Sequence, residues 1–326
     1  MEVLVTGGTG RIGRKLIPAL LEKGHRVSVL VRNKKKATEL LPPECKVIIG
    51  DITDYNSIRG CCDGIDIVYH LVGISGTENP SEKELARYRY INVEGLRNVV
   101  NEAIGKVKRF IYVSSIAAMG IIKEMPIRAD SVCLPYSPYS VSKYEAEQLI
   151  LNQVKNNHFP AIILRPTKVY GPGGEYAYEN IIKMIKFGIL PRMREALVSH
   201  CFIDDLISTL ICSIEKGKNG DIYICTTEKS IGFYESVRLI SSLMKRRVIM
   251  IPVSRWVMFF IAFLVEKVCC LFRKKPFVTR RNILSMTTDR VYDLSKNKED
   301  FGFISNVTME DGIRRCVMYN KDKGLF

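Results

Sequence analysis

Tyr139 and Lys143 are the two side chains of this sequence best placed for acid–base chemistry. They form the pattern Tyr-x-x-x-Lys at the start of a helix-like stretch, and residues four apart share one face of a helix. A free tyrosine titrates near pH ~10, and an ammonium group held close to it lowers the phenol pKa. The spacing therefore predicts that Tyr139 is an acid/base usable near neutral pH.

Two serines follow the strand-like run Ile111-Tyr112-Val113. A hydroxyl at the end of such a strand can bond a substrate oxygen and stabilise the charge that develops on it. The alternative is that Ser114 and Ser115 only cap the end of the strand, and we expect this of one of the two.

A glycine-rich turn stands near the start of the chain, in Thr6-Gly7-Gly8-Thr9-Gly10-Arg11-Ile12-Gly13. It follows a strand-like run and opens a helix from about Ile12 to Lys23. Gly7, Gly10 and Gly13 allow a tight turn, a close approach of a pyrophosphate, and close packing of helix on sheet. With phosphates on the amides of the helix N-terminus, the pattern predicts a dinucleotide site.

The residues after the second strand-like run bear on the choice between NAD and NADP. The segment Val31-Arg32-Asn33-Lys34-Lys35-Lys36 has no acid before Glu39, although an NAD site expects a carboxylate there. Arg32, with Arg11, could pair with a 2′-phosphate; the alternative is a solvated basic turn. NADP(H) is favoured, with NAD(H) as the alternative. In Gly50-Asp51-Ile52, the Asp51 carboxylate could accept a bond from the adenine amino group.

These residues need a sheet to position them. Apolar runs alternate with amphipathic helical stretches through the first half of the chain, which is typical of an α/β fold with a Rossmann-type, doubly wound parallel sheet. Ligands then bind at the carboxyl ends of the strands. The expected strands are Val3–Val5, Val27–Val31, Val47–Ile49, Ile65–Leu71, Phe110–Val113 and Ala161–Leu164, with Phe202–Ile203 and Ile222–Cys225 returning to the sheet pattern.

Composition sets the outer limits. The chain has 326 residues and a formal net charge of +15, with 47% hydrophobic and 25% charged residues. These values exclude a disordered, collagen-like or multi-span membrane chain. Ten cysteines contain no C-x-x-C pattern, so no metal site is expected and the thiols should be reduced. The strand-like run directly after Met1 leaves no room for a leader, which favours the cytoplasm.

Together these motifs resemble the extended short-chain dehydrogenase/reductase family, which includes the NAD-dependent epimerase/dehydratase group. The resemblance covers nearly the whole chain. Its carriers are the glycine turn, Asp51, Asp66-Ile67-Val68-Tyr69-His70-Leu71, Asn92-Val93-Glu94-Gly95, Val113-Ser114-Ser115, Tyr139 with Lys143, Arg165-Pro166, Val169-Tyr170-Gly171-Pro172-Gly173 and Phe202-Ile203-Asp204-Asp205.

The resemblance implies the roles of four catalytic residues. Tyr139 would be the acid/base, Lys143 would hold the nicotinamide ribose and tune Tyr139, and Ser115 would bind the reacting oxygen. Asn92 would support the lysine through a water. The reaction implied is hydride transfer between a nicotinamide and a secondary alcohol or ketone. The expected cofactor-binding residues are Gly7, Gly10, Arg11, Ile12, Gly13, Arg32, Asp51, Ile52, Leu71 and Lys143.

The resemblance also implies a domain organisation. Residues 1–170 would form the NAD(P)-binding domain, with 200–226 returning to it, and 171–326 a smaller, discontinuous substrate-binding domain. Phe187-Gly188-Ile189-Leu190-Pro191 and the tail around Tyr292-Asp293-Leu294 look most like the dihydroflavonol-reductase and 3β-hydroxysteroid-dehydrogenase branch. Those relatives act on rather apolar ring alcohols and ketones.

Two departures from the family's patterns limit the reaction. Ile116-Ala117 stands where the family's dehydratases carry Asp-Glu, so dehydration would lack its acid and base. Met119 stands where many sugar epimerases carry a tyrosine. An NDP-sugar epimerase with retained NAD is the alternative enzyme, and a non-catalytic dinucleotide-binding scaffold or sensor is the other. Retention of Tyr139, Lys143 and a strand-end serine counts against the scaffold.

The excess charge is local. Residues 245–281 hold ten basic side chains and one acid, a net charge of +9, around the apolar run Trp256–Val265. Ten apolar residues are too few for a spanning helix. A buried helix is the favoured interpretation; the alternative is an interfacial helix on an anionic membrane surface. We expect a small-molecule substrate and no nucleic acid, since no recognition motif occurs. A homodimer is a further expectation.

Overall fold

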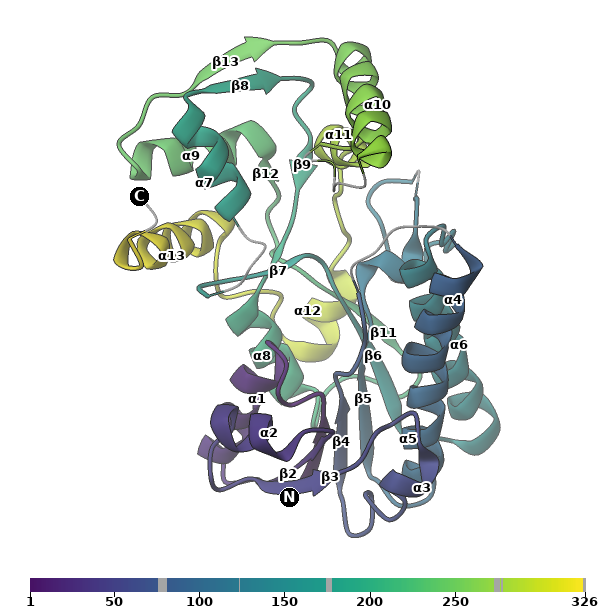
Figure 1. The fold of residues 1–326 in the computed structure, drawn as a ribbon. Coiled ribbons are helices and arrows are strands. Elements are labelled where there is room, and N and C mark those ends of the chain that lie inside the picture. Colours follow the sequence, from purple (N-terminus) through teal and green to yellow (C-terminus); the bar gives the residue numbers. More distant parts are fainter. Residues whose placement is uncertain (76–80, 123, 174–177, 273–275, 277, 325–326) are drawn as a thin grey trace. The chain divides into compact units, whose positions relative to one another are not determined.

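The computed structural model describes residues 1–75, 81–122, 124–173, 178–272, 276 and 278–324 (Figure 1). The chain forms two compact units, each assembled from separate stretches. The first consists of Met1–Lys168, Ile203–Thr226 and Asp293–Asn306, and the second of Val169–Phe202, Thr227–Tyr292 and Val307–Phe326.

The first unit is built on a seven-stranded sheet whose neighbouring strands all run parallel. The strand order is β11-β6-β5-β4-β1-β2-β3, so the chain winds outward in both directions from β1, and ligands bind at such a switch point. The expected doubly wound α/β fold is confirmed. The strands are β1 (Glu2–Thr6), β2 (Arg26–Val31), β3 (Lys46–Ile49), β4 (Ile67–His70), β5 (Arg109–Val113), β6 (Ala161–Pro166) and β11 (Ile222–Cys225).

Helices cover both faces of this sheet (Figure 1). One face carries α1 (Gly13–Glu22), α2 (Lys34–Leu40) and α8 (Ile203–Cys212). The other carries α3 (Tyr55–Ile58), α4 (Glu82–Arg89), the π-helix η1 (Tyr90–Glu94), α5 (Gly95–Ala103) and α6 (Pro138–Asn157), and the 3₁₀-helix η2 (Ile116–Met119) follows β5.

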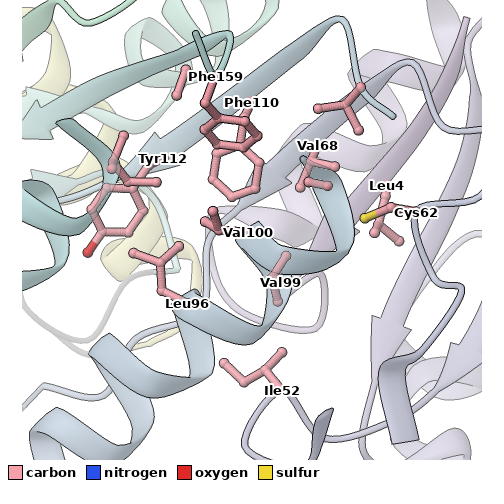
Figure 2. Close-up of a cluster of buried hydrophobic side chains, with 14 of the residues drawn as sticks. Leu4, Ile52, Cys62, Val68, Leu96, Val99, Val100, Phe110, Tyr112 and Phe159 are labelled. Carbon is pink, nitrogen blue, oxygen red and sulfur yellow. The ribbon is translucent and has the colours of Figure 1, made fainter. Parts of the chain in front are cut away.

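The hydrophobic core under α5 fixes the position of β4 and β5, the strands that lead into the candidate site. Figure 2 shows α5 side chains reaching toward side chains of the sheet. The buried cluster includes Leu4, Val68, Phe110 and Tyr112 from the sheet, Leu96, Val99 and Val100 from α5, and Ile52, Cys62 and Phe159 from the connecting segments.

The segment 293–306 was assigned by the sequence analysis to the substrate domain, and the structure corrects this assignment. Its helix α12 (Ser295–Phe301) covers the edge strand β11 of the first unit. Asn297 Nδ2 donates to Ile224 O at 3.0 Å, and the Phe301 ring packs on Tyr223 with 4.7 Å between centroids. An edge strand needs such a cover to satisfy its backbone and bury its side chains.

The second unit combines short strand pairs with helices. Its strand pairs are β7 (Val169–Tyr170) with β10 (Cys201–Phe202), β8 (Ile189–Arg192) with β13 (Ile249–Pro252), and β9 (Leu197–Val198) with β12 (Ile231–Gly232). The helices are α7 (Glu179–Phe187), α9 (Phe233–Leu243), α10 (Arg255–Leu271), α11 (Arg280–Thr287) and α13 (Met309–Asp322).

Two sequence expectations for this half need correction. Phe202 pairs with Tyr170 in the second unit instead of joining the large sheet, and Ile203 begins α8. The apolar run at 256–265 is helical, but the favoured interpretation of a buried helix is wrong, because only Ala262 of α10 is buried. Among the described residues, no helix is long and apolar enough to cross a membrane.

Candidate active site

The glycine turn after β1 has the backbone geometry that a dinucleotide requires. Gly7 has φ +78°, and a Cβ there would lie 3.0 Å from the backbone of Leu71 and Val72. A Cβ on Gly13 would lie 2.5 Å from Gly8 Cα. These positions accept only glycine, which leaves the space above the turn open for a close backbone approach.

The start of α1 adds the electrostatic requirement. Ile12 stands at the helix N-cap without a side-chain cap, and the first turn carries no acid. The N–H groups and the positive end of the dipole therefore suit phosphate oxygens. Arg11 lies half-buried in the same turn, and Gly10 is exposed. The residues present thus fit a dinucleotide diphosphate.

Sequence reasoning missed the role of Gly8. A Cβ at this position would lie 2.4 Å from Val29 Cγ1 and 2.9 Å from Ile17 Cδ1. Gly8 therefore lets α1 pack against β2, a function that the sequence analysis gave to the other three glycines. The sequence does contain a signal for this role, because Gly8 is the second glycine of the Gly7-Gly8 pair.

Arg32 and Asp51 lie together where β2 and β3 end. Arg32 Nη1 stands 3.6 Å from Asp51 Oδ2, and Asp51 Oδ1 accepts from Thr53 N at 3.0 Å and Thr53 Oγ1 at 2.8 Å. Burial works against the charge of Asp51, but the Thr53 bonds and Arg32 outweigh it and lower its pKa. The two residues expected at the ribose and at the adenine therefore form one ion pair.

Ile52 and Leu71 hold different positions around this site. The Ile52 side chain is buried in the core, where a Cβ on Gly95 would come within 2.6 Å of it. Its carbonyl accepts from Asn98 Nδ2 at 2.8 Å. Leu71 donates from its backbone N to Thr6 O at 3.1 Å, which places it beside the glycine turn. Ile52 thus supports the site from the core, and Leu71 borders it.

Asn92 ties the segment after β4 to helix α6. Its Oδ1 accepts from Ile74 N at 2.8 Å, and its Nδ2 donates to Ile74 O at 3.2 Å and to Ser142 Oγ at 3.0 Å. A Cβ on Gly73 would lie 3.2 Å from Lys143 Nζ and 3.6 Å from Asn92 Oδ1. The structure thus brings Asn92 and Lys143 together around Gly73, a residue that sequence reasoning missed.

Lys143 is buried and does not pair with Tyr139. Its Nζ donates to Tyr112 OH at 3.1 Å and to Val113 O at 3.0 Å, and it lies 4.8 Å from the centre of the Tyr112 ring. Burial disfavours the ammonium and lowers its pKa to about 8. Lys143 therefore spans from α6 to the end of β5, beneath the edge where ligands bind.

Tyr139 stands at the first turn of α6, and Ser115 is its partner. The helix start is fixed by a capping box in which Ser137 and Ser140 bond each other's backbone N–H, with a proline at the first position. Burial raises the pKa of Tyr139, and the hydrogen bond from Ser115 offsets only part of the rise. The expectation that Lys143 lowers the Tyr139 pKa is not met here, because the ammonium is turned to Tyr112.

The two strand-end serines have separate partners. Ser115 Oγ accepts from Ala117 N at 3.2 Å, which caps η2, and also bonds Tyr139. Ser114 Oγ donates to Glu147 Oε1 at 2.5 Å and is buried. Ser115 is therefore the serine available to a reacting oxygen, and Ser114 belongs to the supporting structure.

Glu147 and Arg165 form a fully buried ion pair behind these serines. Arg165 donates from Nε to Glu147 Oε1 at 2.9 Å and from Nη2 to Oε2 at 2.7 Å. Its Nη1 donates to Ala129 O at 2.8 Å. The pair locks α6, which carries Tyr139 and Lys143, onto β6. Arg165 was already among the motif residues of the sequence analysis, whereas the only sequence signal for Glu147 was its place four residues after Lys143.

The arrangement supplies one proton donor, one hydrogen-bonding hydroxyl and one cation at the carboxyl edge of β5, next to a dinucleotide cradle. A phenol that keeps its proton at neutral pH can protonate an oxygen that gains negative charge. The Ser115 hydroxyl can stabilise the same oxygen. This combination is suited to reduction of a carbonyl and, in reverse, oxidation of an alcohol.

Comparisons with known proteins identify the family of this chain. The model of the NAD dependent epimerase/dehydratase family matches residues 3–225. UDP-glucose 4-epimerase from Vibrio cholerae is 26% identical over 97% of this chain and 94% of its own length. The 3 beta-hydroxysteroid dehydrogenase/Delta 5→4-isomerase of Mycobacterium tuberculosis is 25% identical over 98% of this chain and 90% of its own.

A solved structure extends the comparison to the fold. UDP-glucuronic acid 4-epimerase from Bacillus cereus, in complex with NAD, superposes with a TM-score of 0.76 at 22% identity and covers 99% of both chains. At this identity the likeness concerns the fold.

Proposed function

Because the chain belongs to the NAD-dependent epimerase/dehydratase family, we propose that it is an NAD(P)-dependent oxidoreductase that interconverts a secondary alcohol and a ketone. The observation that carries the proposal is the group of Tyr139, Ser115 and Lys143 at the carboxyl edge of β5, each held by a partner in the first unit. A protein that only bound a dinucleotide would need no such group.

In this proposal each residue has one task. The nicotinamide, when bound, supplies or accepts the hydride. Tyr139 gives its proton to the ketone oxygen during reduction and takes it back during oxidation, while Ser115 holds the same oxygen by a hydrogen bond. Lys143 would bind the ribose hydroxyls of the cofactor with its ammonium, which is held at the end of β5 by Tyr112 and Val113. Asn92 keeps Ile74 and Ser142 in place through its hydrogen bonds to both.

The raised pKa of Tyr139 favours one direction. At neutral pH the phenol holds its proton, so it is ready to act as an acid toward a ketone. Oxidation of an alcohol requires the phenolate, which becomes more abundant as the pH rises. We therefore propose ketone reduction as the direction that runs best at neutral pH.

NADP(H) is the proposed cofactor, with NAD(H) as the alternative. Arg32 at the end of β2 suits a 2′-phosphate, since no acid follows it before Glu39. Asp51 is its present partner at 3.6 Å, and a phosphate would compete with this carboxylate for the guanidinium. Arg32→Ala should raise the KM for NADPH by about tenfold and leave that for NADH nearly unchanged. Equal effects on both would contradict the preference.

An apolar substrate is supported by the segment that follows Ser115. Val132 is 77% exposed and Leu134 is 58% exposed, and Ile121 and Tyr136 also expose half or more of their surface. These side chains belong to the same unit as Tyr139. We propose that the substrate contacts this surface, which suits an apolar ketone better than the hydroxyl and phosphate groups of an NDP-sugar.

The alternative enzyme is an NDP-sugar epimerase, favoured by the relative from Vibrio cholerae. Heat-released nucleotide separates the two: an epimerase retains NAD through purification, whereas a reductase releases an exchangeable cofactor. A panel of apolar ketones and NDP-sugars, followed by NADPH and NADH absorbance, would then identify the reaction.

We also propose where the protein is located, namely in the cytoplasm. All ten cysteines are free, which suits the cytoplasm. Attachment to an anionic membrane through residues 245–281 is proposed as well, and homodimer formation stays a prediction.

Tyr139→Phe is the direct test of the mechanism. The substitution removes only the phenol hydroxyl, so turnover should fall by about 10²–10⁴-fold, while the Kd for NADPH stays within about twofold. Both are measurable by steady-state kinetics and by fluorescence titration of the cofactor. Unchanged turnover on a true substrate would refute the role of Tyr139.

A further inference from the structure

Helix α10 in the second unit carries apolar side chains toward solvent. We call this its outer face: Trp256, Val257, Phe260, Ile261, Leu264 and Val268. At about 100° per residue these positions fall on one half of the helix surface. Trp256 is 77% exposed and Phe260 is 62% exposed, and the other four side chains are exposed as well. A surface helix ordinarily turns charged residues toward solvent, whereas α10 turns apolar side chains toward solvent.

The inner face of α10 already has its own partner. Ala262 packs with Met193 and Ile283 in a small core, which Met258, Phe259 and Met286 border. The helix is therefore held in place by one side, and its outward apolar side chains are not needed for that packing. A contiguous exposed apolar surface of this kind marks an interaction site.

Basic groups border the outer face. The Arg255 guanidinium lies 5.9 Å from the ring of Trp256, and the exposed Lys267 directly precedes Val268 of the outer face. Lys and Arg place their stems along apolar surface in this manner and keep the charge at its edge.

The one acid of the region is already neutralised. Glu266 accepts from Arg280 N at 2.8 Å and from Arg280 Nε at 2.9 Å. Residues 245–281 thus carry a net charge of +9 with their single carboxylate engaged. Arg273, Lys274 and Lys275, which contribute to this charge in the sequence, lie outside the described residues.

The strand pair before α10 also exposes apolar side chains. Ile189 of β8 and Ile249 of β13 are register partners, and both are more than half exposed. Only Val253 and Ser254 connect β13 to α10, and Figure 1 shows the ribbon leading into the helix.

We propose that the outer face of α10 docks on an anionic lipid bilayer, with the helix lying in the plane of the interface. The 17-residue helix would cover about 25 Å of the surface, with aromatic and aliphatic side chains among the acyl chains and the basic rim at the headgroups. A second copy of this chain is disfavoured, because pairing the face with itself would bring together two regions of charge +9. This inference goes beyond the proposed oxidoreductase chemistry and does not depend on it.

Trp256 is the only tryptophan of the chain, so its fluorescence reports on the outer face directly. The full-length protein is mixed with vesicles of phosphatidylcholine, alone or with phosphatidylglycerol. The anionic vesicles should shift the emission to the blue and protect Trp256 from iodide, and brominated acyl chains should quench it. Higher salt should weaken the binding because it screens the charges. Emission that is the same with and without anionic vesicles would overturn the proposal.

Phe260→Glu tests the apolar part of the contact, and Met318→Glu on the exposed surface of α13 is the matched control. Phe260→Glu should lower partition onto anionic vesicles by at least about tenfold, and Met318→Glu should have little effect. Equal binding of both variants would mean that charge alone acts, which overturns docking by this face. Self-association of the wild type that Phe260→Glu abolishes, without vesicle binding, would assign the face to a second copy.

Tyr139→Phe should bind vesicles like the wild type. The membrane inference and the proposed reaction can therefore fail separately.

Discussion

Helices α6 and α10 depart from the ordinary amphipathic pattern in opposite ways. Helix α6 buries polar and charged side chains, including Ser142, Lys143 and Glu147, and each has a hydrogen-bond partner. Helix α10 exposes apolar side chains such as Trp256 and Phe260. Either arrangement costs stability in water. The proposed chemistry in α6 and the proposed membrane contact of α10 would each account for that cost.

The largest expected effect comes from removing the Glu147 carboxylate, which is buried in α6 behind the candidate site. Glu147→Ala leaves the Arg165 guanidinium buried and unpaired, which should lower the free energy of unfolding by about 3–5 kcal/mol. Glu145→Ala is the control on the same helix, since Glu145 pairs with Arg89 at the surface and such pairs contribute about 0–1 kcal/mol. Urea denaturation measures both. Similar losses for the two variants would show that burial does not distinguish them.

Lys143 offers a test through pH. Its pKa is lowered to about 8 by burial, so between pH 8 and 10 the unfolded chain binds more protons at this residue than the native protein does. The penalty for burying the ammonium is complete below pH 8 and is relieved as the pH rises, by up to about 1.4 kcal/mol per pH unit.

The effect is isolated by comparing the wild type with Lys143→Met, because other groups titrate equally in both. The stability of the wild type should rise relative to the variant between pH 8 and 10, while its activity falls as the ammonium is lost. A difference in stability that does not vary with pH would mean that the lysine is not buried in its charged form.

The smallest expected effect belongs to α10. Phe260→Glu should change the free energy of unfolding in vesicle-free buffer by no more than about 0.5 kcal/mol, because the Phe260 side chain faces solvent. Ala262→Glu, on the inner face, should cost several kcal/mol, roughly 3 or more, by burying an unpaired carboxylate. A large loss for Phe260→Glu would show that its ring supports the fold of the second unit.

The strands and the glycine turn of the first unit could be predicted from the sequence because their signals are local. Short apolar strands, the glycine turn and the Tyr139–Lys143 spacing each lie within a few neighbouring residues, and the strands predicted for the first half were found. The partners of these residues were not predictable in the same way. Lys143 bonds Tyr112, which is 31 positions away in the chain, and Glu147 bonds Arg165, which is 18 positions away. The sheet and its covering helix bring these residues together, so the local sequence does not reveal the pairs.

In the second unit, the sequence predicted the helix at 256–265 but not which of its faces is covered. The run Trp256–Val265 is apolar on every face, so its periodicity cannot say which face is covered. Covering depends on α11 and Met193, which come from separate stretches of chain. The same holds for 293–306, where the cover of β11 depends on an edge strand formed some 70 residues earlier, as the bond from Asn297 to Ile224 shows.

The return of α12 to the first unit has a consequence for how this protein can be altered. The chain passes from one unit to the other five times, at residues 168, 202, 226, 292 and 306. Neither unit is a continuous piece of the gene, so a deletion from the C-terminal end that reaches Asn306 begins to remove the first unit as well, and one that reaches Asp293 removes all of its last stretch. Exchange of the second unit with that of a relative would require several separate grafts, and a single crossover between β11 and α12 would join the β11 of one protein to the covering helix of the other.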